Sequence, residues 1–300
     1  MTNNKILISI ILNCYNGERY LKEALKSINA QSFKNWELIF WDNRSTDSSK
    51  KILFDTIKNK KKIKYFYSKK HTSLYAARNL AIKKAKGHFI GFIDSDDTWE
   101  KDKLLKQVKL FQDKNVGVVY GNSWLKKESN NKKRKFINYK MKSGLIYNDL
   151  INNYNVGILT ALIKRELIKK KKKVFNDRYN IIGDYDLFIR LSKKNKFNVI
   201  QEPVATYRIH ETNFSVLNKD LEIEEFNHWL NKNKSILSKK NYITIKKRVK
   251  FLEFLNLKFS KTFLSCLKFF VRSSKFIFNV KNIFILLLPK FFLKKIMWFN

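Results

Sequence analysis

The stretch FIGFIDSDD, residues 89–97, decides the fold of this 300-residue chain. Its apolar first part, residues 89–93, predicts a buried strand. Three acids follow at once: Asp94, Asp96 and Asp97. Like charges held close together repel, and folding alone gives no reason to gather them. A turn that caps the next helix needs one aspartate, so three favour a site for a divalent cation, an ion that commonly holds substrate phosphates.

Strand and helix patterns alternate on both sides of this stretch. Apolar runs predict strands at residues 6–12, 36–41, 63–67, 89–93 and 116–120. Helical spacing of apolar residues predicts helices at residues 18–31, about 46–57, 74–86 and 99–114. We expect Ser45 or Thr46 to cap the second of these helices and Gly87 to end the third. The alternation predicts a mostly parallel sheet covered on both faces, with the acids at its ligand-binding edge.

The second half of the chain has a less regular pattern. It predicts a hairpin within residues 136–147, a strand at 156–163, a helix at 184–194 and short strands at 199–201 and 204–209. From residue 220 onward the pattern is helical, with polar breaks near Ser238 and Ser260. We therefore expect two domains: an α/β domain at residues 1–215 and a basic, aromatic, helical region at residues 216–300.

The net charge of the chain is +38, from 63 Lys and Arg against 25 Asp and Glu. Such a charge indicates a nucleic acid or an anionic membrane as partner, although the abundance of lysine and asparagine throughout is typical of AT-rich genomes. Residues 239–300 hold 15 Lys and Arg, one acid, Glu253, and 14 aromatic residues. This mixture favours docking on an anionic membrane surface, with Phe side chains and Trp298 in the interface. The alternative is an ordinary helical subdomain with its Phe residues in a core.

Cysteine use and apolar runs bear on location. Cys14 and Cys266 lie far apart and fit neither a disulfide framework nor a zinc pattern, so we expect a reducing cytoplasm. The first apolar run is preceded only by Lys5 and followed by no small-residue cleavage site, which favours a strand over a signal peptide. The apolar run at residues 283–288 is too short to span a bilayer, which needs about 20 residues.

Polar residues also follow the first two predicted strands. Asp42 and Asn43 come directly after the second strand, where an acid and an amide can bond the edge of a base or simply make a turn. Residues 13–18 join the first strand to the first helix, whose free N–H groups can hold a diphosphate or a nucleotide. A plain turn explains Gly17 equally well.

Three further side chains carry candidate chemistry. Arg78, inside a predicted helix, can bind a phosphate through two N–H groups or simply face solvent. Asp184 opens a predicted helix and is either its N-cap or a general base that deprotonates a hydroxyl. His210 ends a short strand, where an imidazole is a metal ligand or an ordinary surface histidine.

In chain order these segments resemble the inverting glycosyltransferases of family 2, which have the GT-A fold. The similarity covers roughly residues 5–215 and rests on several segments in the right order rather than on any single motif. The matching segments are ISIILNCYN (8–16), LKSINAQSF (25–33), WELI (36–39), DNRSTD (42–47), ARN (77–79) and GHFIGFIDSDD (87–97).

The resemblance implies an α/β fold with a mixed, Rossmann-like sheet flanked by helices, and a role for each matched residue. Asp96, with Asp94 or Asp97, corresponds to the DXD element, which reaches the ribose and holds Mn²⁺ or Mg²⁺ on the diphosphate. Asp184 corresponds to the catalytic base. Many members have two aspartates where this chain has Asp42 and Asn43, which leaves the donor less defined. The implied nucleotide-sugar-binding residues are Asn13, Tyr15, Asn16, Glu18, Asp42, Asn43, Arg78, Asp94 and Asp96, and the implied metal ligands are Asp96, Asp97 and His210.

The implied activity is a metal-dependent, inverting transfer of a sugar from a UDP-sugar to a hydroxyl of a glycan or a lipid-linked acceptor, as in O-antigen or capsule synthesis. Such an enzyme would work at the cytoplasmic face of the membrane. The alternative classes are a basic nucleic-acid-binding protein or metal-dependent nuclease, and a family member that binds without catalysing. The order of the segments weighs against a nucleic acid, as does a sequence without paired zinc ligands or an RNP-type motif.

Overall fold

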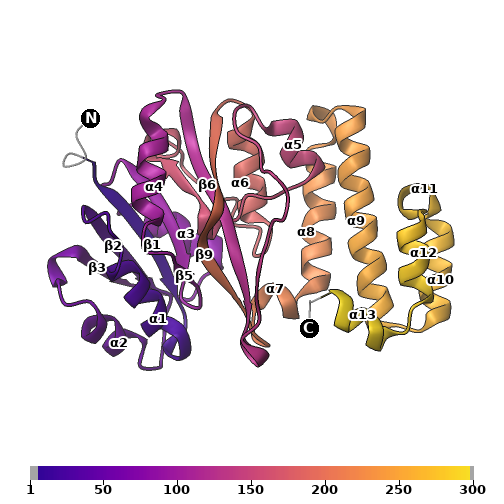
Figure 1. Cartoon of the computed structure of the whole chain (residues 1–300), viewed down its shortest axis with the longest axis horizontal. Coiled ribbons are helices and arrows are strands. Elements are labelled where there is room, and N and C mark those ends of the chain that lie inside the picture. Colours follow the sequence, from indigo (N-terminus) through magenta and orange to yellow (C-terminus); the bar gives the residue numbers. More distant parts are fainter. Residues whose placement is uncertain (1–5, 298–300) are drawn as a thin grey trace. The chain divides into compact units, whose positions relative to one another are not determined.

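The computed structural model describes residues 6–297. The chain divides into two compact units, and the boundary along the sequence lies between His210 and Glu211. The first unit is built on a sheet and the second is helical (Figure 1). The sequence placed this change at residues 215 and 216. Each unit is described by itself below.

Four parallel strands form one side of the sheet in the first unit. They are β1 (Ile8–Cys14), β2 (Trp36–Asp42), β3 (Ile63–Tyr67) and β4 (Phe89–Asp94), and they lie in the order β3-β2-β1-β4. Every residue of β1 and β2 is buried, as expected for strands covered on both faces. These four predicted strands are therefore confirmed, with ends that differ by at most two residues.

The other side of the sheet mixes strand directions. β8 (Leu162–Lys164) pairs antiparallel with β4 and with β6 (Val116–Lys127). β9 (Lys196–Ile209) runs parallel to β6, and β5 (Thr98–Trp99) pairs antiparallel with β9. β7 (Lys133–Lys135) pairs with β6 outside this order. The sheet is therefore mixed, as the family resemblance implied, whereas the alternation of strands and helices predicted only its parallel side.

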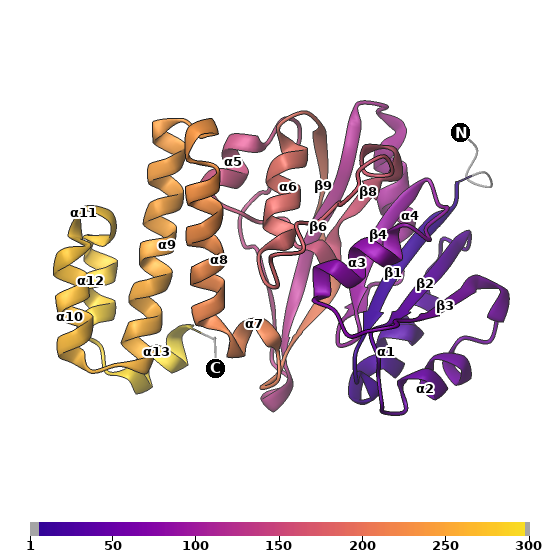
Figure 2. The same cartoon turned by 180° about the vertical axis from the view of Figure 1, so that it is seen from behind.

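Helices cover the two faces of the sheet. Figures 1 and 2, which view it from opposite sides, show α4 (Lys103–Lys109) over one face and α3 (Leu74–Ile82) and α6 (Gly183–Ser192) over the other. The first helix, α1 (Glu18–Asn29), buries the stripe that its sequence predicts. The members of that stripe are Tyr20, Leu21, Ala24, Leu25 and Ile28.

The helix predicted at residues 99–114 is wrong at its start. Trp99 lies in the strand β5, opposite Ala205 of β9. Its backbone N–H donates to Ser27 Oγ (3.1 Å) and its indole N–H to the carbonyl of Leu159 (3.0 Å). The helix α4 begins at Lys103 and is followed by a 3₁₀ turn, η3 (Leu110–Gln112). Ser27 and Leu159 lie 72 and 60 residues away from Trp99 in sequence, so a local sequence pattern cannot predict these contacts.

Two other helix boundaries differ from their predicted caps. The helix α2 (Ser49–Thr56) begins after Ser45 and Thr46, whose groups bond the loop at Asn16 instead. The helix α3 ends at Ile82 rather than at Gly87. Gly87 is required by packing, since a Cβ there would lie 2.5 Å from the backbone nitrogen of Ser9.

The region of residues 136–164 also differs from its prediction. It holds no hairpin: Gly144, at φ +96°, bridges to Phe197, and α5 (Tyr147–Asn152) begins soon afterwards. The strand predicted at 156–163 is a 3₁₀ turn, η5 (Ile158–Thr160), followed by β8. The remaining 3₁₀ turns of the described part of this unit are η2 (Lys60–Lys62), η4 (Glu128–Asn130) and η6 (Arg165–Leu167).

The two short strands predicted at residues 199–201 and 204–209 are one strand, β9. Its register against β6 shifts around Asn122, so that Pro203 sits at the irregularity where its missing N–H is tolerated. The break in the sequence pattern was therefore a bulge within a strand and not a loop between two strands.

The second unit is helical, as predicted. Its elements are α7 (Phe214–Leu217), α8 (Lys219–Lys232), η7 (Lys234–Ile236), α9 (Lys239–Ser260), α10 (Phe263–Arg272), α11 (Ser274–Ile277), α12 (Val280–Leu287) and α13 (Lys290–Met297). The hydroxyl groups of Ser238 and Thr262 cap α9 and α10, which confirms the breaks expected near residues 238 and 260.

The second unit has its own apolar core. Its buried members are Phe254, Cys266, Phe270, Ile277, Ile285, Leu286 and Leu293. Part of the aromatic content therefore packs as a core, as the subdomain alternative predicted. Across residues 6–297, no helix combines the length and apolarity that a membrane crossing needs. Trp298, which the sequence placed in a membrane interface, lies outside the described residues.

Candidate active site

Side chains expected at a ligand site meet at one edge of the sheet. Asn13 lies opposite Asp94 on one side and opposite Trp41 on the other, and Cys14 lies opposite Asp42. Because β1, β2 and β4 are parallel, their carboxyl ends share this edge. The register therefore brings together residues that the sequence separates by as much as 81 positions.

Asp42 and Asn43, expected to contact a base, are bonded within the protein. The Asp42 carboxylate accepts hydrogen bonds from the Ser45 N–H (2.7 Å) and the Tyr65 hydroxyl (2.8 Å). The Asn43 amide donates to the carbonyl of Thr72 (2.7 Å) and accepts from its N–H (3.2 Å). Both side chains are buried. They hold two loops in place and do not present their polar atoms to the surface.

The start of α1, expected to offer free N–H groups, is also satisfied by the protein. The N–H of Glu18 donates to Asp47 (2.9 Å), and the N–H of Gly17 donates to Ser49 Oγ (3.0 Å). The Glu18 carboxylate accepts from the Ser48 N–H, and Asn16, at φ +49°, accepts from the Thr46 N–H. These contacts correct the expectation that this helix start is open to a diphosphate.

Asn13 differs from its neighbours. It is buried, with 8% of its surface exposed, and neither its amide nitrogen nor its amide oxygen has a hydrogen-bond partner in the described protein. Buried amides are rarely left so, and an exception calls for a ligand or a water. The exposed ring of Tyr15 lies close by in sequence, with its centroid 4.4 Å from that of His71. The sequence analysis did not predict His71 as a site residue, because no motif or spacing in the sequence distinguishes it.

Arg78 is buried and not solvent-facing. Its guanidinium lies 2.5 Å from Asp94 Oδ1, and only 2% of its side chain is exposed against 33% for Asp94. A buried cation needs a partner of opposite charge, so this pair fixes the direction of Asp94 at the end of β4.

Tyr75, which the sequence analysis missed, joins this pair to Asp184. The Arg78 guanidinium lies 5.2 Å from the centroid of the Tyr75 ring. The Tyr75 hydroxyl lies 3.0 Å from the carbonyl of Ile181 and 3.3 Å from Asp184 Oδ1. Gly183 permits this approach, because a Cβ there would lie 2.6 Å from the tyrosine ring. A line of contacts therefore runs from Asp94 through Arg78 and Tyr75 to Asp184.

Asp184 has the properties of a proton acceptor. Burial raises the pKa of its carboxyl to about 6, against the opposing effects of the Tyr185 N–H, the Arg78 charge and the Tyr75 hydroxyl. It is not the N-cap of α6, a position held by Ile182. A carboxylate with a pKa near 6 is ionised at neutral pH and still basic enough to take a proton from a hydroxyl.

Asp96 and His210 form a second pair. Asp96 Oδ2 lies 3.0 Å from His210 Nε2, and the imidazole ring lies 4.9 Å from the ring of Tyr20. The Asp96 side chain is 26% exposed, so it remains accessible to a ligand. Arg208 anchors the acidic turn from behind, since its guanidinium donates to the Asp96 carbonyl (2.9 Å) and pairs with Glu23 and Glu128.

Asp97 lies apart from this pair. Its carboxyl is buried and accepts a hydrogen bond from the Arg208 N–H (2.9 Å). Burial, with the charges of Asp96 and Asp94, raises the pKa of this carboxyl well above its usual value. Of the expected ligand set Asp96, Asp97 and His210, the structure pairs Asp96 with His210, whereas the Asp97 carboxyl accepts a bond from the backbone of Arg208.

The remaining pair fits a divalent ion only in part. A carboxylate oxygen and an imidazole nitrogen are ligands for ions such as Mn²⁺, and imidazole is an unusual ligand for Mg²⁺. Within the described part of the chain, no group of three or more His, Cys, Asp and Glu is arranged to hold a metal. The pair therefore suits an ion that takes its other ligands from a bound diphosphate and water.

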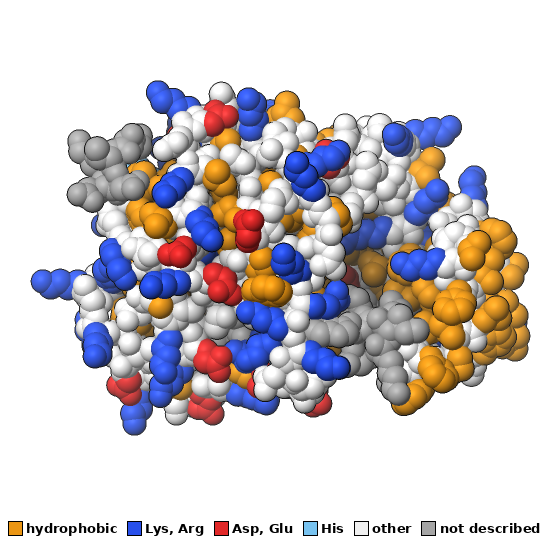
Figure 3. Space-filling view, in the orientation of Figure 1, with side chains coloured by type: hydrophobic (Ala, Val, Ile, Leu, Met, Phe, Trp, Pro, Cys, Tyr) orange, Lys and Arg blue, Asp and Glu red, His pale blue; other side chains and the backbone are white. Residues whose placement is uncertain are grey.

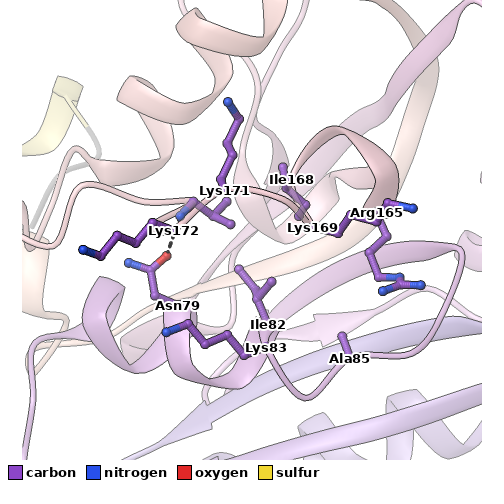
Figure 4. A pocket seen from close by; sticks show the side chains of 10 residues that line it. Asn79, Ile82, Lys83, Ala85, Arg165, Ile168, Lys169, Lys171 and Lys172 are labelled. Carbon is purple, nitrogen blue, oxygen red and sulfur yellow. Dashed lines mark hydrogen bonds between the residues drawn. The ribbon is translucent and has the colours of Figure 1, made fainter.

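A pocket lies elsewhere on this unit, between α3 and the segment after β8 (Figure 4). Its lining is basic, and no acid takes part in it. The lining residues are Asn79, Ile82, Lys83, Ala85, Arg165, Ile168, Lys169, Lys171, Lys172 and Val174. None of them is a predicted site residue, so this hollow and the acidic edge of the sheet are separate features.

One known family and several named relatives are similar to this sequence. Residues 9–187 match the family described as Glycosyl transferase family 2. TuaG of Bacillus subtilis (strain 168), a "putative teichuronic acid biosynthesis glycosyltransferase", is 34% identical over 55% of this chain and 65% of its own length. The chain thus spans just under two thirds of that relative. WfgD of Escherichia coli, a "UDP-Glc:alpha-D-GlcNAc-diphosphoundecaprenol beta-1,3-glucosyltransferase", is 31% identical over 70% of this chain and 79% of its own length.

Solved structures share the fold. TarS of S. aureus (residues 1–349, in complex with UDP) superposes with a TM-score of 0.60 at 19% identity, covering 92% of this chain and 76% of its own. The mannosyltransferase PcManGT of Pyrobaculum calidifontis, in complex with GDP-Man and Mn²⁺, gives a TM-score of 0.60 at 14% identity, covering 91% of this chain and 81% of its own. The mixed sheet flanked by helices is therefore the GT-A fold.

Proposed function

Because the chain belongs to glycosyl transferase family 2, we propose that it is an inverting glycosyltransferase that moves a sugar from a nucleotide diphosphate to an acceptor hydroxyl. The line of contacts Asp94–Arg78–Tyr75–Asp184 carries this proposal. It joins the acidic end of β4, where a donor diphosphate is expected, to a carboxylate suited to proton transfer. A nuclease or another nucleic-acid protein has no comparable support from the relatives.

The donor nucleotide is assigned to the edge of β1. Asn13 has buried amide atoms without a partner in the described protein, and Tyr15, two positions on, packs its ring against that of His71. The roles of Asp42, Asn43, Asn16 and Glu18 become those of loop anchors. UDP is the first choice of nucleotide, because TarS structures hold UDP and UDP-GlcNAc, whereas PcManGT holds GDP-Man.

The metal is assigned to Asp96 and His210, with Mn²⁺ preferred over Mg²⁺ on the grounds of the imidazole. When bound, the ion would neutralise the charge that develops on the diphosphate as it leaves. The protein fixes the geometry: Arg208 holds the turn that carries Asp96, and Tyr20 packs on the ring of His210. Asp94, which Arg78 holds and which is 33% exposed, is assigned to the ribose and the diphosphate.

Asp184 is assigned as the general base. It takes the proton of the acceptor hydroxyl while that oxygen attacks the anomeric carbon from the side opposite the diphosphate. The bond to the diphosphate breaks as the new glycosidic bond forms, so the product has inverted configuration. The Tyr75 hydroxyl orients the carboxylate and stabilises its ionised form.

The acceptor is proposed to be a glycan or a lipid-linked sugar in the synthesis of a cell-surface polysaccharide. The names of TuaG, WfgD and the amylovoran enzyme AmsB of Erwinia amylovora, 27% identical to this chain, support this class. A lipid-linked acceptor would place the enzyme on the cytoplasmic face of the membrane, where O-antigen, lipopolysaccharide and capsule precursors are assembled.

Thermal unfolding with UDP, with and without Mn²⁺, tests the site apart from the acceptor. We expect UDP with Mn²⁺ to raise the melting temperature more than UDP alone, because a ligand that binds only the folded state stabilises it. Asp96→Ala should abolish the Mn²⁺-dependent part of the shift. Asp102→Ala, which removes an exposed acid without a side-chain cap bond, is the matched control. A Mn²⁺-dependent shift that Asp96→Ala leaves intact would contradict the assignment.

A further inference from the structure

The helices after residue 260 bury one set of apolar side chains and expose another. The buried set forms the core of the second unit. The exposed set, called the apolar face below, has between 53% and 85% of each residue's surface accessible. Its members are Phe263, Leu264 and Val271 on α10, Phe278, and Val280, Phe284 and Leu287 on α12.

The apolar face follows the helical repeat. Val280, Phe284 and Leu287 stand at positions i, i+4 and i+7 of α12, so they lie along one side of that helix. Leu264 and Val271 are seven positions apart on α10. Single exposed apolar residues are normal, but outward stripes on two helices of one core are not. Figure 3 shows hydrophobic side chains gathered over these helices at the right of the view.

Exposed basic side chains alternate in sequence with the residues of the apolar face. From residue 254 to residue 300 the sequence has nine Lys and Arg and no Asp or Glu. Lys261, Lys268, Arg272, Lys275 and Lys281 are all exposed. Lys268 follows Leu264 by four positions, so that base and apolar residue share one side of α10. The surface is therefore apolar and cationic, with no carboxylate of its own to neutralise it.

We propose that the apolar face docks this unit on an anionic lipid bilayer, with the helices lying in the interface and their bases against lipid phosphates. Among residues 6–297 no helix combines the length and apolarity needed to cross a membrane. Helices with apolar and basic sides of this kind bind in the plane of the interface. A dimer formed through the apolar face is disfavoured, because the Lys and Arg side chains of the two copies would repel one another. A nucleic acid would use the bases but gives no role to aliphatic stripes.

Sedimentation of the full-length protein with lipid vesicles tests this docking without donor or acceptor. We expect cosedimentation with vesicles of equal phosphatidylglycerol and phosphatidylcholine, and little with phosphatidylcholine alone. The double variant Phe284→Asp/Leu287→Asp should weaken binding by about 10-fold or more, because it places charge where apolar burial is needed. Both positions are exposed, so folding should persist and is checked by circular dichroism.

The matched control is Phe214→Asp/Leu217→Asp on α7, which makes the same charge change at exposed apolar residues outside the face. It should bind as the unaltered protein does. The variant Lys268→Gln/Arg272→Gln should bind the vesicles more weakly than the unaltered protein. Added salt should make this difference in binding smaller, because it screens the charges of the lysine and arginine. The proposal is overturned if the unaltered protein ignores anionic vesicles or if the Phe284→Asp/Leu287→Asp variant binds them equally. It is also overturned if those substitutions instead break up a dimer seen by gel filtration.

Discussion

The two halves of the site use polar side chains differently. After β1 and β2, Asp42, Asn43 and Glu18 are bonded to the backbone of neighbouring loops. At the end of β4, Asp94 pairs with Arg78 and Asp96 pairs with His210. Backbone bonds fix a shape, whereas pairs of ionisable side chains can exchange a partner for a ligand or a proton. Similar residues at neighbouring strand ends therefore serve the fold in one half and the chemistry in the other. The structural half is Asp42, Asn43 and Glu18 with the loops they bond. The chemical half is Asp94, Asp96 and their partners, together with Asp184, which contacts this group through Tyr75.

The largest effect should come from Asp184→Asn, which removes the proposed base from the chemical half. We expect kcat to fall by about 1,000-fold, since general base catalysis contributes 100- to 10,000-fold. Stability should not fall. Burial raises the folded pKa of Asp184 to about 6, so this group favours folding at low pH and loses that contribution as pH rises through about 6. At pH 8 the variant should therefore unfold at the same temperature or a higher one.

The readout for Asp184→Asn is transfer kinetics alongside thermal unfolding. Asp186→Asn on the same helix is a comparison that removes an acid paired with Arg190. That change should lower stability modestly and leave most of kcat. A protein that binds UDP and keeps its full rate after Asp184→Asn would show that Asp184 is not the base.

The next effect concerns the structural half. Asp42→Ala leaves the Ser45 N–H and the Tyr65 hydroxyl without their acceptor, which should cost about 2 kcal/mol of unfolding free energy. We expect kcat to stay within a few-fold of normal, and denaturant titration measures the loss. Asp55→Ala, at an exposed position on α2, should change little. Unchanged stability with a raised KM for the donor would show instead that Asp42 contacts the nucleotide.

A smaller and pH-dependent effect is expected from Tyr75→Phe. The Tyr75 hydroxyl lowers the pKa of Asp184, so its loss should raise that pKa further above about 6. A base must be ionised to act, and the acid side of the kcat profile should therefore move to higher pH. Activity should drop several-fold at pH 6 and little at pH 8. Tyr139→Phe, an exposed position, is the control, and an equal loss at both pH values would argue for a purely structural role.

The sequence predicted the place of the site better than the use of its residues. Asn13, Asp42 and Asp94 lie at one edge of the sheet because their strands are parallel and in register. This could be predicted, since both the apolar run of a strand and the residues at its carboxyl end are visible in the local sequence. Which polar atom is already bonded is decided by distant loops: Tyr65 for Asp42, Thr72 for Asn43. Composition could not separate buried from exposed Phe in the helical unit, since Phe270 and Phe284 differ only in the side of a helix they occupy.

The smallest effect, from Asp97→Asn, is the sharpest test of the boundary between the two halves. Asp97 directly follows Asp96 in the chain, yet its carboxyl is buried, has a raised pKa and accepts a hydrogen bond from the Arg208 N–H. An asparagine oxygen can accept the same bond from the Arg208 N–H. We expect unfolding to change by less than about 1 kcal/mol and the Mn²⁺-dependent response to UDP to persist. Asp96→Asn should remove that response. If Asp97→Asn removes it as well, Asp97 binds the ion and belongs to the chemistry after all.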